Sequence, residues 1–248
     1  MVMKEKKIAG YSFFQFENLS SFPSLEHVIT TRHPLLDLRG EEGRKRLRDI
    51  LEGKDIFTVA QVHGAQWVVV GENSSPSSFL GIQADALLTQ RKGVYLGVKV
   101  ADCLPVIFFD PEREALALLH AGWRGIIGGI HLRVAQAMRN FFSSSYSSLL
   151  AGIGPGIGQC CFVVSEEVAQ LFEKRERGKK NIDRKEDRIL INLKGFLFDE
   201  LVDQGFDPHK IEVAPYCTFC EKELFYSYRR EGKEAGRFML LASLKEGR

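Results

Sequence analysis

Short apolar runs rich in Val, Ile and Phe recur along the chain from Glu26 onward, and Gly, Pro, Asp and Asn residues separate them. Runs of this length with such punctuation are typical of β-strands. The pattern therefore predicts a mixed fold dominated by strands. The expected strands cover residues 28–31, 56–60, 67–70, 86–88, 94–99, 106–109, 115–119, 149–153 and 211–214.

Three helices are predicted between these strands. Residues 125–142 place apolar side chains on one face at helical spacing, and a serine-rich run ends the stretch. A second helix is expected to begin at Ser165, because a serine N-cap followed by two glutamates suits the positive end of a helix. The third covers about 192–204 and precedes Gly205, a residue type favoured just beyond helix ends.

The chain shows neither a fixed-period repeat nor a linker that would separate two cores. It is therefore predicted to form a single α/β (α+β) domain over residues 1–248. The segment 174–188 is mostly charged and of mixed sign, which predicts an exposed, mobile connection.

The composition excludes several classes of protein. Of 248 residues, 44% are apolar, which is incompatible with global disorder. With 34 Lys and Arg against 32 Asp and Glu, the net charge of +2 lacks the positive excess of a nucleic-acid-binding protein. No apolar run approaches the ~20 residues of a membrane span, and the charged N-terminal segment does not resemble a secretory signal. We therefore expect a cytoplasmic protein with reduced thiols and with no nucleic-acid or membrane partner.

Three short motifs place reactive side chains at the ends of predicted strands. They are Gln61-Val62-His63-Gly64, Ala101-Asp102-Cys103-Leu104-Pro105 and Leu119-His120-Ala121-Gly122-Trp123-Arg124-Gly125. Pro105 cannot donate to a sheet ladder, so it is expected to interrupt its strand. The imidazoles of His63 and His120 and the thiolate of Cys103 suit a Zn²⁺ ion whose fourth position is open, and Cu²⁺ is an alternative occupant.

The same residues also fit a second chemistry, in which Cys103 is a nucleophile, His120 is its base, and Asp102 or a backbone carbonyl orients the imidazole. Taken singly, a buried cysteine is usually a small apolar residue, and a histidine is usually a satisfied polar group. The joint occurrence of these residues at successive strand ends favours a functional site.

The other four cysteines are weaker candidates. Cys217 and Cys220 have CxxC spacing, but a zinc ribbon needs a second pair. Cys160 and Cys161 are adjacent, and neighbours on a strand point to opposite faces, so they would chelate poorly together. All four are therefore expected to be packing residues.

Two further features bear on substrate binding. The glycine-rich stretch 152–158 lacks the Lys-Ser/Thr of a P-loop and the register of a dinucleotide fold, so neither nucleotide motif is present. Residues 224–230 mix aromatics with arginines and could stack a planar substrate. An anionic substrate would need cationic partners, for which the candidates are Arg32, Arg124, Arg229, Arg230 and Arg237.

Together these motifs resemble the YfiH-like, or laccase-domain, family, whose members have been described both as multicopper polyphenol oxidases and as purine nucleoside phosphorylases. The resemblance runs from about residue 28 to residue 238. It rests on the three motifs above, on Ala84-Asp85-Ala86, on Gly154-Pro155-Gly156-Ile157-Gly158 with Cys161-Phe162, and on Cys217-Thr218, Phe225-Tyr226-Ser227-Tyr228-Arg229-Arg230 and Gly236-Arg237. The chain departs from the family pattern after Arg32, where His33-Pro34-Leu35-Leu36-Asp37 replaces a Gly-Gly-x-Ser turn.

The resemblance implies a layered α/β/β/α domain with mixed sheets in a cytosolic, monomeric protein. It also implies that His63, Cys103 and His120 are zinc ligands at the catalytic centre of a purine nucleoside phosphorylase. The implied substrates are phosphate with adenosine, inosine or S-methyl-5′-thioadenosine, and adenosine deamination is an implied side activity. The other residues expected at this site are Arg32 and Arg229, which would bind substrate, and Gln61, Asp85, Asp102 and Arg124, which would support the metal ligands.

Three alternatives stay open from the sequence. Copper-dependent oxidation of phenols is one, although six histidines, of which two lie in site-like motifs, are few for several copper sites. A Cys–His amide hydrolase built on Cys103 and His120 is the second. A non-catalytic metal-binding or interaction protein is the third, and it requires a protein side chain at the fourth position of the metal.

Overall fold

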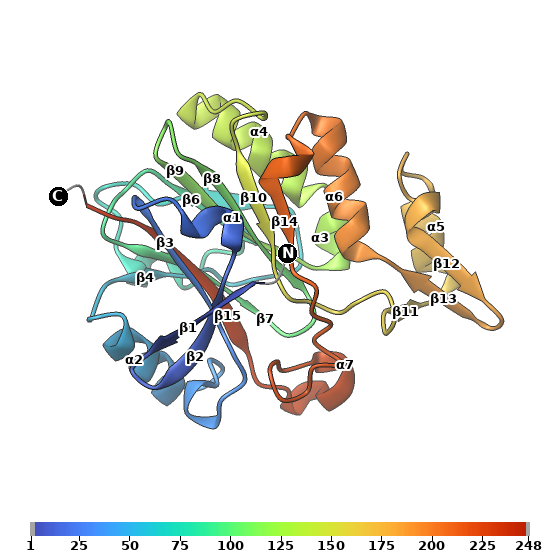
Figure 1. Cartoon of the computed structure of the whole chain (residues 1–248), viewed down its shortest axis with the longest axis horizontal. Helices are drawn as coiled ribbons and strands as arrows, with labels where there is room; N and C mark the ends of the chain where they lie inside the picture. Colours follow the sequence, from blue (N-terminus) through green and yellow to red (C-terminus); the bar gives the residue numbers. More distant parts are fainter. Residues whose placement is uncertain (1–2, 247–248) are drawn as a thin grey trace.

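The computed structural model describes residues 3–246 (Figure 1), and its strands form two six-stranded sheets and one three-stranded sheet. The first sheet has the order β1 (Lys4–Ile8), β2 (Tyr11–Gln15), β3 (Leu25–Thr30), β15 (Phe238–Leu244), β7 (Tyr95–Val100) and β4 (Ile56–Phe57). The second has the order β14 (Ile211–Val213), β10 (Leu150–Ile153), β8 (Leu104–Asp110), β9 (Ala115–Ala121), β6 (Ala86–Thr89) and β5 (Trp67–Val69). The third sheet has the order β11 (Val163–Val164), β13 (Arg188–Ile191) and β12 (Ile182–Lys185).

Helices and short 3-10 turns connect these strands. The α-helices are α1 (Glu17–Ser20), α2 (Glu41–Ile50), α3 (Trp123–Ile127), α4 (Ile130–Phe142), α5 (Glu166–Glu173), α6 (Leu193–Gln204) and α7 (Tyr228–Glu231). The 3-10 turns cover Pro34–Leu36, Pro76–Phe79, Lys179–Asn181, Pro208–Lys210 and Gly232–Glu234. Within residues 3–246, none of the helices has the length and apolar character needed to cross a membrane.

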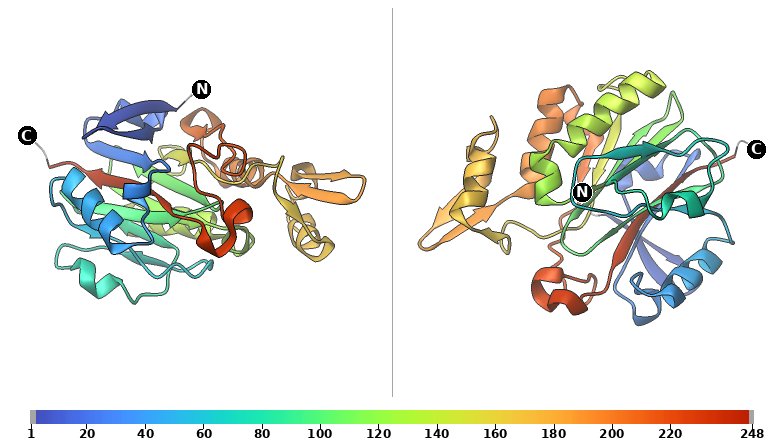
Figure 2. Two further views of the ribbon diagram at one scale, coloured as in Figure 1. Left: turned by 90° about the horizontal axis from the view of Figure 1, so that it is seen from below. Right: turned by 180° about the vertical axis from the view of Figure 1, so that it is seen from behind.

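The two large sheets pack face to face, and helices cover both outer faces (Figure 1, Figure 2). On the outer face of the first sheet, Leu47 of α2 joins a buried cluster with Phe13 of β2. On the outer face of the second sheet, Val134 of α4 and Leu197 of α6 pack against Phe108 of β8 and its neighbours. The structure therefore confirms the predicted α/β/β/α layering with mixed sheets.

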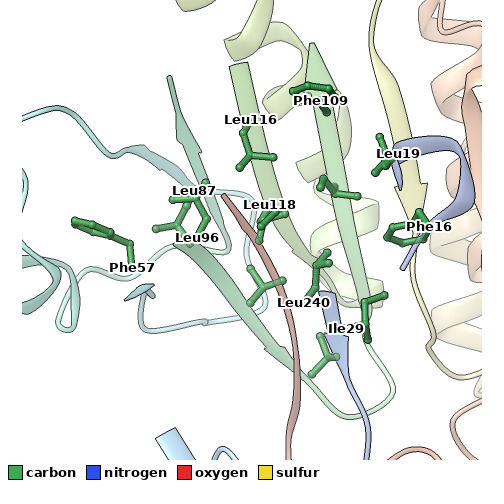
Figure 3. Close-up of a cluster of buried hydrophobic side chains, with 14 of the residues drawn as sticks. Phe16, Leu19, Ile29, Phe57, Leu87, Leu96, Phe109, Leu116, Leu118 and Leu240 are labelled. Carbon is green, nitrogen blue, oxygen red and sulfur yellow. The ribbon is translucent and has the colours of Figure 1, made fainter. Parts of the chain in front are cut away.

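The central core lies between the two large sheets (Figure 3). In β8, Ile107 and Phe109 point into this core, whereas the alternate residues Val106 and Phe108 belong to the cluster beneath the helices. Every residue of β8 and β9 is buried, because both faces of the second sheet are covered. Each fully buried Leu, Ile, Val or Phe stabilises the fold by about 1.5–3 kcal/mol, so the unbroken apolar runs of the sequence reflect this double burial.

Two details near the second sheet differ from the expectation. The helix predicted over 125–142 is divided into α3 and α4 at Gly128 and Gly129, and Gly129 has a positive φ of 75° that glycine adopts without strain. Pro105 does not interrupt its strand. It is the second residue of β8, a position near a strand start where the missing N–H is tolerated, and it pairs with His120.

The charged segment 174–188 contains regular structure instead of forming only a mobile connection. Strand β12 pairs antiparallel with β13, and the two project with α5 to one side of the large sheets (Figure 1, Figure 2). Arg184 forms ion pairs with Glu166 at 2.7 Å and with Glu173 at 2.9 Å, both on α5. Arg184 of this segment therefore links β12 to α5.

The buried imidazole of His27 on β3 makes stability depend on pH. Its Nε2 accepts the backbone N–H of Phe16 at 2.9 Å, so the ring is held neutral. Burial lowers the pKa of His27 from 6.5 to about 4. Between these two pH values the unfolded state binds more protons than the folded state, so we expect up to about 3 kcal/mol of stability to be lost as the pH falls through this window.

Denaturant unfolding of the wild type and of His27→Gln at pH 7 and pH 4 measures this contribution. A glutamine at this position does not titrate, so the stability advantage of the wild type over the variant should shrink by about 3 kcal/mol at the lower pH. An advantage that is equal at both pH values would show that His27 does not titrate differently on folding.

Candidate metal centre and substrate cavity

The three motifs singled out in the sequence meet at one end of the second sheet. His63 lies in the connection between β4 and β5, Cys103 in the turn between β7 and β8, and His120 near the end of β9. Their metal-binding atoms all lie within 4.8 Å of one another. The two imidazole rings are 4.7 Å apart between centroids and are tilted by 78°. The structure therefore brings together all three predicted ligands.

Strand pairing determines how Cys103 approaches His120. The antiparallel register of β8 and β9 sets Pro105 opposite His120, so Cys103, two residues earlier, lies beside the end of β9. Gly122 follows at the start of α3, and a Cβ atom there would lie 3.0 Å from the Cys103 Sγ and 3.2 Å from the His63 Cδ2. A larger residue at this position would push the ligands apart.

The fully buried carboxylate of Asp85 holds two of the three ligands in place. It accepts backbone N–H groups of His63 at 2.9 Å and of Gly64 at 2.7 Å. It also accepts the His120 Nδ1–H at 2.7 Å, because a carboxylate offers no proton of its own, and this leaves Nε2 of His120 free for a metal. His63 has a positive φ of 60°, a conformation that costs energy outside glycine, and the Asp85 hydrogen bonds stabilise that turn.

The candidate ligand residues also shift one another's pKa values. Burial of the Cys103 thiol disfavours its charge, but the neighbouring His120 and His63 outweigh burial and lower the pKa of Cys103. Burial likewise disfavours a charged His120, yet the Cys103 thiolate and Asp85 raise the pKa of His120. The site therefore favours the thiolate, which is the form of cysteine that binds metals.

The donor set fits a single divalent ion. Zinc binds histidine nitrogen at about 2.0–2.1 Å and cysteine sulfur at about 2.3 Å, so tetrahedral ligand atoms lie about 3.3–3.8 Å apart. The three donors lie within 4.8 Å of one another, a range that includes these separations, and all three residues border the cavity described below. Imidazole and thiolate suit both zinc and copper, so the chemistry of the donors leaves the identity of the metal open.

Asp102 contacts the C-terminal part of the chain. Its Oδ1 accepts the Thr218 hydroxyl at 2.6 Å, and its Oδ2 accepts the backbone N–H of Arg229 at 2.6 Å. Both oxygens are thereby used to hold the start of α7 beside the cavity. The hypothesis that Asp102 orients the His120 imidazole is therefore wrong, because Asp85 has that contact.

A cavity of about 770 Å³ opens onto the three candidate ligands. This volume lies within the range of small-molecule binding sites. Its aromatic lining residues are Trp123, Phe162 and Tyr228, and its cationic lining residues are Arg39, Lys99, Arg124, Arg229 and Arg237. The cavity therefore offers flat apolar surfaces together with a concentration of positive charge.

Lys99, like Arg39, is a cavity cation that the sequence interpretation missed. It lies half-buried on β7, and in residues 3–246 no carboxylate forms an ion pair with its ammonium group. Burial and the nearby charges of Arg44 and Arg237 lower its pKa. An anion in the cavity would neutralise this repulsion. The sequence feature that could have identified Lys99 is its position as the single charged residue in the otherwise apolar run of β7.

The other predicted site residues occupy different positions. Arg229 borders the cavity, with its guanidinium 5.6 Å above the Phe162 ring. Arg32 is not among the described residues that line the cavity. Its guanidinium pairs with Glu231 at 2.5 Å and lies 5.0 Å above the Tyr226 ring, so its role in substrate binding stays a prediction.

Gln61 and Arg124 both line the cavity. The Gln61 amide donates to the Lys99 carbonyl at 2.8 Å and accepts the Lys99 N–H at 2.9 Å, so it fixes the His63 connection to β7. The Arg124 guanidinium lies 4.3 Å above the Trp123 ring at the start of α3. These contacts position the metal-site connection and an aromatic wall of the cavity.

Comparisons with known proteins identify the family of this chain. The model of the multi-copper polyphenol oxidoreductase laccase family matches residues 38–245. A purine nucleoside phosphorylase from Bacteroides thetaiotaomicron is 28% identical, with 96% of each chain covered. A protein named adenosine deaminase RL5, from an unknown prokaryotic organism, is 30% identical over 74% of this chain and 72% of its own length. The crystal structure of the Bacillus licheniformis protein YfiH superposes with a TM-score of 0.86 at 28% identity, covering 97% of this chain and 99% of that one.

Proposed function

Because this chain belongs to the multi-copper polyphenol oxidoreductase laccase family, we propose that it is a zinc-dependent purine nucleoside phosphorylase. The observation that carries the proposal is a single cavity that joins the His63, Cys103 and His120 donors to the unpaired ammonium of Lys99. A phosphorolytic enzyme must hold an anionic phosphate and a planar base in one site, and this cavity has surfaces for both. The name of the Bacteroides relative supports the same reaction.

The metal would be held by His63, Cys103 and His120, with the fourth position facing the cavity. When bound there, zinc supplies Lewis-acid chemistry at that open position. Asp85 keeps His120 in the tautomer whose Nε2 faces the other ligands. Since the His120 contact and backbone N–H groups outweigh burial and lower its pKa, Asp85 acts as an ionised positioning residue and does not supply a proton.

Lys99 and Arg237 are the groups we assign to phosphate, and the aromatic rings of Trp123 and Tyr228 are those we assign to the purine. In the reaction, a phosphate oxygen forms a bond to ribose C1′ while the bond from C1′ to the purine nitrogen breaks. The purine leaves with one proton, and ribose 1-phosphate remains. The cations neutralise phosphate and hold its oxygen near C1′, which lowers the entropic part of the barrier.

The test is incubation of purified zinc-loaded protein with inosine and phosphate. Hypoxanthine and ribose 1-phosphate should form in equal amounts, and adenosine and S-methyl-5′-thioadenosine should be cleaved in the same way. If none of the three nucleosides is cleaved in the presence of phosphate, the proposal is wrong.

Adenosine deamination is a second candidate activity, because one relative carries the name adenosine deaminase. Adenosine incubated without phosphate should then yield inosine and ammonia at the same metal-dependent site. Metal analysis of protein purified without added metal separates both activities from phenol oxidation, since stoichiometric copper with turnover of a phenol would favour the oxidase.

Replacing Lys99 with methionine tests the phosphate assignment. Loss of one charged hydrogen bond to an anion costs about 1.5–3 kcal/mol, so we expect the KM for phosphate to rise about 10- to 100-fold. The KM for the nucleoside should change much less. Lys92→Met is a matched control, because Lys92 pairs with Glu114 at 2.6 Å and is not part of the cavity lining. Equal phosphate KM values in both variants would remove Lys99 from the phosphate site.

A further inference from the structure

Four of the five cysteines form a second cluster, made by two turns that follow β10 and β14. Cys160 and Cys161 lie in the turn that leads to β11, and Cys217 and Cys220 lie in the turn beyond β14. A parallel bridge between Gly156 and Cys217 joins the two turns. The expectation that these cysteines are packing residues holds for Cys161 and Cys217, which pack against the core beneath the helices, but not for the exposed Cys160 and Cys220. Adjacent Cys160 and Cys161 occupy a turn, where the alternation of a strand does not apply, and both sulfurs reach the same cluster.

The sulfur positions match a tetrahedral thiolate site. All four sulfurs lie within 4.8 Å of one another, with 3.8 Å between Cys160 and Cys220 and 3.4 Å between Cys161 and Cys220. A zinc ion with four sulfur ligands at about 2.3 Å requires separations of about 3.8 Å between the sulfurs. The two separations from Cys220 lie at or slightly below that value, and both exceed the ~2.05 Å of a disulfide.

A backbone donor and a glycine also border the cluster. The Gly158 N–H donates to the Cys217 Sγ at 3.1 Å. A Cβ atom at Gly158 would lie 3.2 Å from the Cys160 Sγ and 3.3 Å from the Cys217 Sγ, so a larger residue would crowd both sulfurs. The chain thus leaves space for the sulfurs and supplies a donor for negative charge on one of them.

We propose that Cys160, Cys161, Cys217 and Cys220 bind a structural Zn²⁺ ion, separate from the site of His63, Cys103 and His120. Four thiolates around a divalent ion leave two negative charges, which need a nearby cation. The buried Lys194 meets this need, because it lines the same pocket as Cys160 and Cys217. Its Nζ is fixed by the carbonyls of Ala214 at 2.7 Å and Tyr216 at 2.6 Å.

The proposed ion would tie together two turns that form part of the substrate cavity. Immediately before the first turn, the Ile157 N–H donates to the Asp102 carbonyl at 2.8 Å, and just after that turn Phe162 lines the cavity. In the second turn, the Thr218 hydroxyl donates to the Asp102 carboxylate that also holds Arg229. Four protein ligands close the coordination shell, so this ion acts through loop position and has no place for a substrate.

Metal content measured by mass spectrometry on protein purified under reducing conditions tests the proposal. We expect two zinc equivalents per wild-type chain and a loss of one equivalent in the Cys217→Ser/Cys220→Ser variant. The Cys103→Ala variant should lose the other equivalent, so each variant is the control for the other. Circular dichroism verifies that both variants are folded. Equal zinc content in the wild type and the folded double serine variant would overturn the proposal.

Cobalt substitution gives a readout that needs no change to the second cluster. In the Cys103→Ala protein loaded with Co²⁺, the cysteine cluster should produce the intense thiolate charge-transfer and tetrahedral d–d bands of a four-sulfur site. Thiol titration should then find the four cysteines protected until a chelator is added. Absence of these bands, or recovery of the four cysteines as disulfides from protein handled without oxidant, would contradict the proposal. Neither measurement depends on phosphorolysis, so it stands apart from the proposed enzymatic function.

Discussion

A Cys103→Ala variant is expected to lose about 10³-fold or more in kcat/KM for inosine phosphorolysis. Cys103 supplies the one thiolate among three donors that lie within 4.8 Å of one another. Its removal leaves two imidazoles, which cannot retain a divalent ion with comparable affinity. The expected loss corresponds to about 4 kcal/mol of transition-state stabilisation, in line with the several kcal/mol that a Lewis-acid metal contributes.

Two measurements separate this effect from damage to the fold. The variant should lose the zinc equivalent that wild-type protein carries at this site, as measured by elemental analysis. Its unfolding midpoint in the presence of a chelator should equal that of the wild type in the same buffer, because Cys103 is only partly buried and lies in a turn. A variant with wild-type turnover would show that the metal centre is not the catalytic centre.

Asp85→Asn is expected to weaken zinc binding by about 10- to 100-fold, although Asp85 does not itself belong to the ligand set. The carboxylate accepts hydrogen bonds from the backbone of His63 and Gly64 and from the His120 ring. An asparagine has one acceptor oxygen, so its NH2 group would face a donor and leave one of these contacts broken. The turn that carries His63 and the tautomer of His120 would both lose their support. Competition with a chromophoric chelator measures the change in zinc affinity.

Asp110→Asn is the matched control for this prediction. Asp110 is also buried and accepts the backbone N–H groups of Glu112 and Arg113, but it lies at the other end of β8 from Cys103. Asp85→Asn breaks one of the hydrogen bonds described above, whereas Asp110→Asn puts a buried NH2 group at the position of Oδ2, which has no hydrogen-bond partner among the described residues. Both variants should therefore lower the free energy of unfolding by about 1–3 kcal/mol. Only Asp85→Asn should change zinc affinity. If the two variants weaken zinc binding equally, the loss reflects general destabilisation and the positioning role of Asp85 is rejected.

Taken together, the two variants distinguish the residues that bind the metal from the residue that orients them. Loss of Cys103 should remove the ion, whereas loss of the Asp85 charge should leave a weakened site that excess zinc restores. Activity of Asp85→Asn should therefore recover at high zinc concentration, while that of Cys103→Ala should not. Restoration of both variants by zinc would contradict the assignment of Cys103 as a ligand.

The candidate metal ligands could be predicted from the sequence because each lies within a short motif next to a strand end. His63 and Cys103 follow the runs that form β4 and β7 of the first sheet, and His120 ends the run that forms β9 of the second, so the packing of the two sheets brings the three residues together. The strand-dominated fold followed from the same runs, whereas the α/β/β/α layering was implied by the family resemblance. Strands such as β8 and β9 are buried on both faces, and that double burial produces the continuous apolar pattern.

The local sequence pattern could not predict contacts between residues that lie far apart in the chain. Strand β15, near the C-terminus, pairs with β3 and β7 in the middle of the first sheet, and no local signal records that position. Strand β1 is mostly charged because it lies at the edge of the sheet, where side chains are exposed, so it lacks an apolar run altogether.

What the sequence determined by itself was the set of reactive residues, the strands that carry them and the family to which they belong. Only the tertiary structure decided which residues lie close together. In the folded chain, Asp85 accepts the hydrogen bond from His120, Lys99 lines the cavity, and four cysteines from two turns form one cluster. The physical reason is that strand and helix periodicity act over a few residues, whereas hydrogen bonds, burial and metal geometry depend on distances that only the folded chain fixes.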